Sequence, residues 1–289
     1  MSDEPGLLPL WTRIPYGVTL PGGESVDVRV GARAPAVDEA LAALSSSSSA
    51  PSRARAWALV TAFNPWAQPA SAADNADADA KLAAWIAARG LPSLRSTGGR
   101  GGDAAWPPEP GYVIAGLDLI DAHALARACA QAAFVYARVG APAALVTVRR
   151  PACDAARSVE TIAWVDVDGH GRVRMVRPRG KPLLFMPGGK KEPGEDDVAA
   201  LARELREELD VRLDEASVVA RFVVEERAYG PVDPTVVKMA CYAARVHGVP
   251  QPASEIEAQE FVGLDQSHRV PPAGHAVLAR LAERAPTVD

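Results

Sequence analysis

Residues 189–211 read GKKEPGEDDVAALARELREELDV, and this stretch decides what the second half of the chain can be. Its apolar residues recur with helical spacing and predict a helix over about Asp196–Leu209 that packs on one side. Three glutamates fall within an arc of about 100° on another side of that helix. The apolar face consists of Val198, Leu201, Leu205 and Leu209, and the acidic face consists of Glu204, Glu207 and Glu208.

The acidic face has a cost that a cation would offset. Glu204 and Glu208 are four residues apart, and like charges at this spacing destabilise a helix by roughly 0.2–0.5 kcal/mol. Magnesium and manganese are hard divalent cations that prefer oxygen ligands, and they would offset this repulsion. The ordinary alternative is an acidic face turned to water. The Pro187-Gly188-Gly189 loop before the helix favours a site, because glycine lets the backbone approach a ligand closely.

With this spacing the stretch resembles the Nudix box, in which a glycine, a glutamate, an Arg-Glu pair, an aliphatic residue, a Glu-Glu pair and a final aliphatic residue stand at fixed distances. Asp210 is the one departure, because the family usually has glycine there. Aspartate tolerates the left-handed backbone conformation, so we expect the helix to end normally. The matching residues are Gly189, Glu195, Arg203, Glu204, Leu205, Glu207, Glu208 and Val211.

The resemblance implies a Nudix (MutT-like) hydrolase that uses Mg²⁺ or Mn²⁺ to cleave a diphosphate linkage in a nucleoside diphosphate-X substrate, by attack of water at phosphorus. The alternative is a non-catalytic Nudix-fold nucleotide sensor coupled to the first half of the chain. In the hydrolase, Arg203 and Glu195 would pair to hold the loop against the helix. The implied metal ligands are Glu204 and Glu208, assisted by Glu207 and the Gly189 carbonyl.

The general base varies within the Nudix family. Here it would be a box glutamate such as Glu207, or Glu257 or Glu255 from the segment Ser254–Glu257. A solvated loop carboxylate is the alternative for the last two residues. The segment is expected to be a loop before a final strand at Glu260–Val262.

Three residues are candidate substrate contacts. Arg179 and Lys190 precede or open the box, and Arg and Lys side chains bind phosphates through charge-assisted hydrogen bonds. Strand alternation would instead turn some of the basic residues in this region to water. Tyr229 lies 18 residues beyond the box, where it either contacts substrate or packs beside the Gly230-Pro231 turn.

The elements around the box predict an α/β/α sandwich with a mixed sheet over residues 157–286. An Asp168-Gly169 turn between two alternating apolar stretches predicts a β-hairpin. A terminal helix is predicted at His275–Arg284. The predicted strands are Thr161–Val167, Arg172–Val176, Leu183–Met186, Val218–Glu226, Thr235–Arg245 and Glu260–Val262.

Residues 7–150 predict a separate, smaller domain of the α/β or α+β class, since helical and strand patterns mix there. A helix is predicted over Ala76–Arg89 with Gly90 at its end, and Asp121 is expected to cap another. The predicted strands are Arg55–Phe63, Gly111–Leu119 and Ala143–Val148. Composition predicts poor order at Ser45–Ser49, at Ser96–Asp103 and at the domain boundary Arg149–Asp154.

Short motifs in this first half resemble an uncharacterised bacterial domain family, a resemblance that implies no activity. The motifs are Thr61–Pro65, Asn75, Trp106–Gly111 and Gln131–Phe134. Within them, Asn64, Glu109 and Gln131 have two interpretations. They either line a pocket, as polar residues at strand ends often do, or serve as turn and capping groups.

Composition bounds the remaining possibilities. The 289 residues are 48% hydrophobic and 23% charged, which is typical of globular proteins. The net charge of −5 argues against general nucleic-acid binding, so we expect a nucleotide-like small molecule as partner and leave a homodimer open. Without a secretory signal or a membrane span, a cytoplasmic location is expected. Three dispersed cysteines indicate reduced thiols rather than a disulfide framework or a zinc site.

Overall fold

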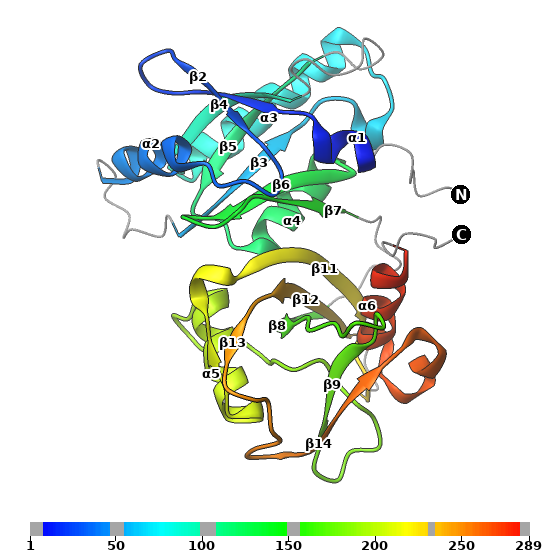
Figure 1. Ribbon diagram of the computed structural model, residues 1–289. Helices are drawn as coiled ribbons and strands as arrows, with labels where there is room; N and C mark the ends of the chain where they lie inside the picture. The colour runs from blue at the N-terminus through cyan, green and yellow to red at the C-terminus, as the bar shows by residue number, and fades with distance from the viewer. Residues whose placement is uncertain (1–7, 47–54, 99–107, 149–156, 231–234, 284–289) are drawn as a thin grey trace. The chain divides into compact units, whose positions relative to one another are not determined.

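The computed structural model describes residues 8–46, 55–98, 108–148, 157–230 and 235–283. The chain divides into two compact units, Met1–Arg150 and Pro151–Asp289, which are described separately (Figure 1). The first unit is the longer of the two, contrary to the expected size order.

The first unit is built on one seven-stranded sheet with the strand order β2-β1-β4-β5-β3-β6-β7. All of its strand pairs are antiparallel, which places the unit in the α+β class. The strands are β1 (Tyr16–Thr19), β2 (Ser25–Val28), β3 (Ala56–Thr61), β4 (Ser93–Gly98), β5 (Glu109–Ala115), β6 (Ala133–Arg138) and β7 (Ala144–Thr147). The helices are α1 (Leu8–Arg13), α2 (Pro35–Ser46), α3 (Ala72–Ala88) and α4 (Leu119–Ala128), with a 3-10 turn at Pro65–Ala67.

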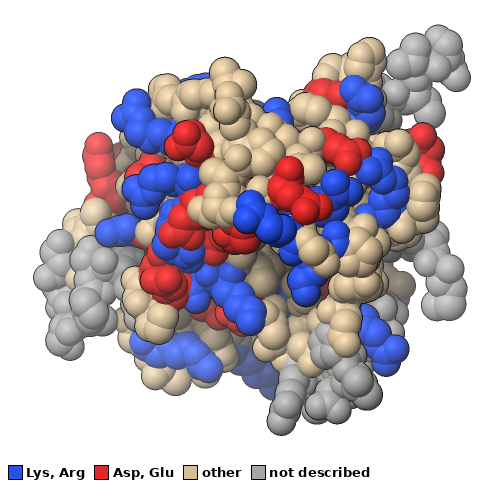
Figure 2. All heavy atoms as spheres, turned by 90° about the horizontal axis from the view of Figure 1, so that it is seen from below, with Lys and Arg blue, Asp and Glu red and all other residues tan. Residues whose placement is uncertain are grey.

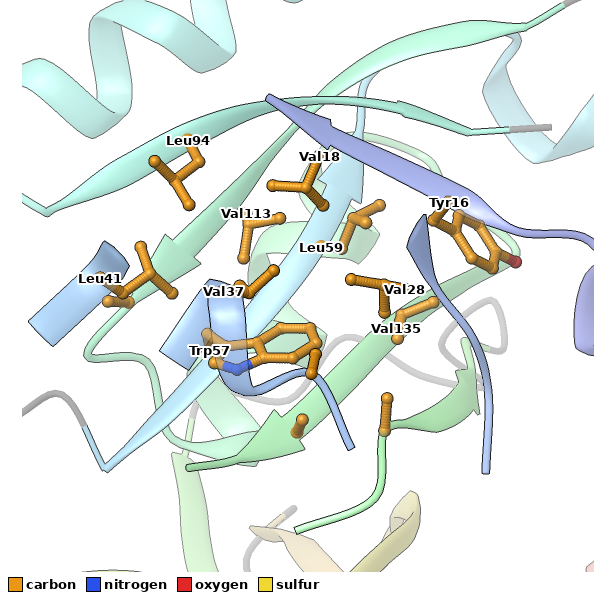
Figure 3. Close-up of a cluster of buried hydrophobic side chains, with 14 of the residues drawn as sticks. Tyr16, Val18, Val28, Val37, Leu41, Trp57, Leu59, Leu94, Val113 and Val135 are labelled. Carbon is orange, nitrogen blue, oxygen red and sulfur yellow. The ribbon is translucent and has the colours of Figure 1, made fainter. Parts of the chain in front are cut away.

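The core of the first unit lies where α2 meets the sheet. Trp57 and Leu59, two residues apart on β3, point to the same side, as strand geometry requires. The Trp57 indole nitrogen donates a hydrogen bond of 2.8 Å to Asp38, which ties α2 to the sheet. Tyr16 lies at the edge of this cluster, with its hydroxyl oxygen on the side away from Trp57 (Figure 3). Helix α3 packs against β5, and α4 packs against β3 and β6.

Several boundaries in the first unit differ from expectation. Ser45 belongs to α2, where its hydroxyl bonds the Leu41 carbonyl, and residues 47–49 lie outside the described ranges. Composition predicted poor order over Ser96–Asp103. The first three of these residues, 96–98, instead belong to β4, because they pair in register with β5. Helix α3 begins at Ala72, earlier than predicted, since the Ser71 side chain accepts from the Asp74 amide.

The cap of α4 is also shifted from the predicted position. Asp118, not Asp121, caps this helix, and its carboxylate accepts from the Asp121 amide at 2.8 Å. Both residues are aspartates at the start of an apolar stretch, so the sequence pattern alone offers two equivalent caps.

The second unit contains a mixed three-stranded sheet with the order β11-β12-β8. Strand β12 is antiparallel to β11 and parallel to β8. The strands are β8 (Arg157–Trp164), β9 (Val173–Pro178), β10 (Arg212–Leu213), β11 (Val219–Arg227), β12 (Thr235–Ala243), β13 (Val246–His247) and β14 (Ile256–Val262). The helices are α5 (Asp197–Leu209) and α6 (Pro272–Ala282), with 3-10 turns at Glu215–Ser217 and Leu264–Arg269.

Two helices cover this mixed sheet from opposite sides (Figure 1). Helix α5 packs against β8 and α6 against β11, which gives the α/β/α sandwich predicted from the sequence. On the α6 side, Phe222 and Val277 are fully buried in one apolar cluster. The buried Arg280 guanidinium lies over the Phe222 ring and donates to the Val223 carbonyl at 2.8 Å.

The predicted β-hairpin is wrong beyond its turn. The Asp168 turn closes, and Val167 bridges Val173, but β8 then pairs with β12 while β9 pairs with β14. The reason lies in the loop before α5. The Ile162 and Trp164 amides donate to the Gly189 and Pro187 carbonyls at 2.8 and 2.9 Å, so this loop occupies the other edge of β8.

Candidate active site

Helix α5 has a side-chain cap at its start and a left-handed residue at its end. The Asp196 carboxylate accepts from the Val198 and Ala199 amides at 3.0 and 2.8 Å. Asp210 ends the helix with φ 52° and ψ 40°. This is the conformation that a glycine would supply, so the residue that departs from the Nudix pattern keeps its backbone geometry.

The three glutamates of the acidic face differ in burial. Glu208 is 6% exposed and lies against the protein, whereas the Glu207 side chain is 50% exposed. The Glu204 side chain is 13% exposed and lies between these extremes. The predicted apolar residues of α5 are all buried. The acidic face therefore starts inside the unit at Glu208 and opens to solvent at Glu207.

Gly188 holds Glu208 through a backbone hydrogen bond. The Gly188 amide donates to the Glu208 carboxylate at 2.8 Å. Gly188 has φ +130°, and a Cβ there would lie 2.2 Å from the Ile162 carbonyl oxygen, so the position requires glycine. Burial, followed by the negative charges of Glu204, Glu255 and Glu207, raises the pKa of Glu208 to about 8.

Gly189 makes a similarly close approach to Glu204. A Cβ at this position would lie 2.3 Å from the Glu204 carboxylate. The Gly189 carbonyl, expected from the resemblance to bind metal, accepts a hydrogen bond from the Ile162 amide. Its role as a metal ligand stays a prediction.

Arg203 joins the loop to the acidic face. Its guanidinium donates to both oxygens of Glu195, at 2.8 and 2.9 Å, and so forms the expected pair. It also donates to Glu204 at 2.8 Å and to the Lys190 carbonyl at 3.0 Å. These bonds lower the pKa of Glu195 to about 2 and raise the pKa of Arg203. Burial raises the pKa of Glu204 despite this neighbour.

A second anchor of the loop was missed in the sequence analysis. Asp197, 5% exposed, accepts a hydrogen bond from the Tyr242 hydroxyl of β12 and pairs with the Lys191 ammonium at 3.0 Å. Tyr242 lies 45 residues beyond Asp197, so no local spacing links them. The available signal was an aspartate in the first turn of a helix whose neighbour Val198 faces the core.

The structure separates the two candidate bases near the end of the chain. Glu257 lies within β14, not in a loop, and pairs with Arg177 of β9 at 2.8 Å. The charge of Glu255, by contrast, contributes to the raised pKa values of Glu204 and Glu208. The loop that carries Glu255 is held beside α5, because the Ala253 amide donates to the Glu208 carbonyl. Glu255 is therefore the better placed of the two.

The candidate substrate contacts are all exposed. The Arg179 amide donates to the Glu255 carbonyl at 2.7 Å, which links it to the loop that carries the candidate base. Lys190 belongs to the loop before α5, and its carbonyl accepts a hydrogen bond from Arg203. The Tyr229 ring is 50% exposed and packs edge-to-face on Phe185, with 6.3 Å between ring centroids. Lys, Arg, Asp and Glu atoms are interspersed over the face shown in Figure 2.

The acidic face fits a divalent cation by its chemistry. Within the described residues, no three His, Cys, Asp or Glu side chains stand together as a ready metal site. Arg203 and the Gly188 amide hold the carboxylates of Glu204 and Glu208 instead. Carboxylate oxygens are nevertheless the ligands that Mg²⁺ and Mn²⁺ prefer. Burial is the main cause that raises the pKa of both glutamates, and the neighbouring carboxylates add to it; a bound cation would favour their charged forms.

Two negative expectations concern cysteines and membranes. Cys129 and Cys241 are free thiols, and Cys153 lies outside the described residues. No helix within the described ranges is both long enough and apolar enough to cross a membrane.

Two family models match separate parts of the chain. The model described as NUDIX domain matches residues 157–284, and the model described as protein of unknown function (DUF3293) matches residues 60–134. The second unit thus contains a Nudix domain, and the first contains the uncharacterised domain that its motifs resemble. None of the curated proteins matches the chain.

Solved structures similar to this chain include three bacterial proteins. The E. coli ORF135 protein is 25% identical, the match covers 46% of this chain and 96% of that chain, and the TM-score is 0.36. The MutT NUDIX hydrolase from Burkholderia pseudomallei is 22% identical, with coverages of 45% and 99% and a TM-score of 0.35. The NUDIX hydrolase from Nitrosomonas europaea is 18% identical, with coverages of 44% and 87% and a TM-score of 0.36.

Proposed function

We propose that the Nudix domain of this chain is a metal-dependent hydrolase that cleaves a diphosphate linkage in a nucleoside diphosphate-X substrate. One observation carries this proposal. A buried carboxylate, Glu208, lies beside Glu204 on a helix whose preceding loop is fixed by the Arg203–Glu195 pair. A nucleotide sensor without catalysis has no need of a buried glutamate with a raised pKa, because burial of its charge is costly without a cation.

Glu204 and Glu208 would bind the cation, with Glu207 as a solvent-exposed third ligand. When bound, Mg²⁺ or Mn²⁺ supplies positive charge that stabilises the diphosphate in the transition state and favours deprotonation of water. Arg203 and Glu195 act as positioning residues, because Arg203 binds both the Lys190 carbonyl and the Glu195 carboxylate and so holds the loop against the acidic face.

The proton of the attacking water needs an acceptor near the acidic face. Glu255 has the position for this role, since its charge acts on both Glu204 and Glu208. Glu207 is the alternative acceptor, because its exposed carboxylate reaches solvent on the same helix face. A candidate base must be free to reach the proton, and Glu257 is instead paired with Arg177, which favours Glu255 and Glu207 over it.

Lys190 and Arg179 would meet the phosphates, and Tyr229 the organic part of the substrate. Lys and Arg provide charge-assisted hydrogen bonds to phosphate oxygens. The exposed Tyr229 ring, supported by Phe185, presents an aromatic surface to a base or sugar. We infer a nucleotide-like small molecule as the substrate class on this ground.

The test is release of phosphate, pyrophosphate or nucleoside monophosphate from a panel of nucleotides, dinucleoside polyphosphates and nucleotide sugars. We expect turnover of at least one member with Mg²⁺ or Mn²⁺ and its loss in EDTA. Glu208→Gln should reduce that turnover at least about 100-fold, because it removes a charge that holds the cation. Arg206→Gln is the matched control, since Arg206 is exposed on the same helix and its backbone bonds are unaffected.

The same panel separates the hydrolase from the sensor. Saturable nucleotide binding by wild-type protein, with no turnover of any panel member in either metal, would overturn the hydrolase and leave the sensor. Equal turnover by wild type and Glu208→Gln would show that the reaction does not depend on the acidic face.

A further inference from the structure

Each unit contains a hollow lined by described residues. The hollow in the first unit is a mostly apolar pocket of about 70 Å³, with Asn64, Glu109 and Gln131 in its lining. The Asn64 side-chain oxygen accepts from the Ala70 amide at 3.0 Å. Gln131 donates to the Phe63 carbonyl at 2.9 Å. The two interpretations of these polar residues, as pocket residues and as turn groups, therefore hold together.

The hollow in the second unit is an open groove of about 910 Å³ at the end of α6. None of the described residues that line it belongs to the acidic face of α5, so the groove is a separate feature of the Nudix domain. Its walls are Arg221 of β11, the turn that contains Val167 and Arg172, the segment Gly263–Asp265, and the last two residues of α6, Leu281 and Ala282.

Arg221 reaches the groove from an irregular position in β11, which is an edge strand of its sheet. From Ala220 to Phe222 the pairing advances two residues on β11 but only one on β12, so Arg221 is an extra residue in the ladder. Such a β-bulge bends the strand and redirects a side chain, and bulges are frequent beside functional sites. The bulge therefore places the Arg221 side chain at the groove.

The guanidinium group of Arg221 is incompletely bonded. Its Nε is buried and has no hydrogen-bond partner among the described residues. Buried polar atoms without partners are rare in folded proteins, and each calls for an explanation such as an absent water or ion. A guanidinium is always charged and its nitrogens only donate. The group that would complete Arg221 is therefore an anion with acceptor oxygens.

The other charges at the groove limit the charge of that anion. The Arg172 guanidinium donates to the Asp168 carboxylate at 2.8 Å and contacts it again at 2.7 Å, so its charge is largely matched. Asp265 adds a carboxylate to the lining. Because the repulsion from Asp265 grows with the charge of the ligand, a single negative charge suits the groove better than a phosphate dianion.

The remaining walls of the groove are apolar and partly open to solvent. Val167 and Leu264 are 43% and 44% exposed, although both are large aliphatic residues. Leu281 and Ala282 add further apolar surface from α6. Exposed apolar surface that adjoins polar groups is typical of binding grooves, where it holds the apolar part of a ligand.

We propose that this groove binds a small organic carboxylate, whose oxygens accept hydrogen bonds from Arg221 and whose apolar chain lies against Val167 and Leu264. Bonds between a guanidinium and a carboxylate are charge-assisted and stronger than neutral hydrogen bonds. Apolar surface that the chain and the two side chains bury together adds to the affinity. The site is independent of the hydrolase proposed above.

Hexanoate is the probe, with acetate, hexan-1-ol and hexyl phosphate as its shortened, uncharged and doubly charged counterparts. The full-length protein is titrated by calorimetry in EDTA, which removes any cation that could hold an anion at the acidic face. The titration is made at about pH 8, where a phosphate monoester carries two charges. Hexanoate should bind saturably with a Kd of about 1 mM or tighter, and each counterpart should bind more weakly.

The decisive variant is Arg221→Gln, which should weaken hexanoate binding at least about tenfold. Arg227→Gln is the matched control, because Arg227 is an exposed arginine of the same strand outside the groove, and it should leave the affinity unchanged. Leu264→Ala should weaken the binding of hexanoate but not that of acetate. Since Leu264 is already 44% exposed, this variant should keep its fold.

Asp265→Asn tests the groove in the opposite direction. It removes the competing carboxylate, so it should tighten hexanoate binding by about twofold or more, and misfolding would not produce such a gain. The proposal is overturned if hexanoate fails to bind, or if hexan-1-ol or hexyl phosphate binds as tightly. It is also overturned if Arg221→Gln leaves the affinity unchanged, or if Arg227→Gln weakens it equally.

Discussion

The two units use carboxylates in opposite surroundings. On α5, three glutamates crowd one face, and Arg203 offsets only part of their charge, so the pKa of Glu208 rises to about 8. In the first unit one carboxylate, Glu109, lines a mostly apolar pocket and accepts a hydrogen bond from the side-chain amide of Asn64. The first arrangement suits a divalent cation that brings a polyphosphate with it.

The two sites also differ in how they are assembled. The acidic face and the loop before it come from one continuous stretch, residues 187–211, so most of this site is set by one helix and the turn before it. The pocket takes residues from α1 and from six strands, and its bonds join positions such as Asn64 and Glu109, 45 residues apart. A local site should tolerate changes elsewhere in its unit but not in its own loop, whereas a dispersed site should depend on the backbone of the whole sheet.

The largest expected effect concerns a glycine in each site. Gly188→Ala should destabilise the second unit by about 3 kcal/mol or more, because its Cβ would lie 2.2 Å from a sheet carbonyl at φ +130°. Gly98→Ala in the pocket should change stability by less than about 0.5 kcal/mol, since its contacts are of ordinary length. Urea unfolding measures both. Equal losses would show that the close approach at Gly188 does not set the stability of its loop.

A smaller loss is expected at the centre of the dispersed site. Asn64→Ala should cost about 2–3 kcal/mol, because it leaves the Ala70 amide and Asn75 without their partner and puts an alanine at φ 49°. Asn64→Gly removes the same bonds but relieves the backbone, so it should recover about 1 kcal/mol of that loss. Urea unfolding of the two variants separates the hydrogen bonds from the strain. No difference between them would mean that the left-handed backbone carries no cost.

Glu195→Gln tests the loop of the local site. We expect about a tenfold loss of hydrolysis, the scale typical of positioning residues around metal sites. The variant should also lower the melting temperature at neutral pH. Because the pKa of Glu195 falls from 4.5 to about 2 in the folded protein, its charged form stabilises the fold above pH 4.5, and this contribution disappears as the pH falls towards 2. The gap in melting temperature should therefore close over that range, and a gap independent of pH would contradict the ion pair.

Asp210→Gly should have the smallest effect. Glycine occupies the left-handed region without the strain that aspartate carries at φ 52°, but it loses more entropy on folding. The net gain in stability should not exceed about 1 kcal/mol, and hydrolysis should stay within about twofold of wild type. A large change in the rate of hydrolysis would mean that the Asp210 carboxylate takes part in binding or catalysis.

The same difference in assembly explains what could be predicted from the sequence. Helix α5 and its acidic face follow from spacing within one stretch, and the Arg203–Glu195 pair follows from the resemblance of that stretch to the Nudix box; the structure forms all three. The Asp197–Tyr242 bond and the parallel pairing of β8 with β12 depend on tertiary packing, and no local pattern encodes them. Glu257 was misplaced for a related reason. Its strand begins at Ile256, earlier than its apolar pattern suggests, so its side chain meets Arg177 across the sheet instead.

The loop before α5 has a further consequence through its contact with β8. By bonding Ile162 and Trp164, residues Pro187 and Gly189 cover a strand edge that would otherwise expose unpaired amides and carbonyls. Open edges of this kind recruit strands from other molecules and lead to aggregation. The segment that builds the acidic face thus also protects the sheet from intermolecular pairing. Damage to this loop should therefore lower solubility as well as hydrolysis, so selection for a soluble protein would preserve part of the site even in a relative that had lost its catalysis.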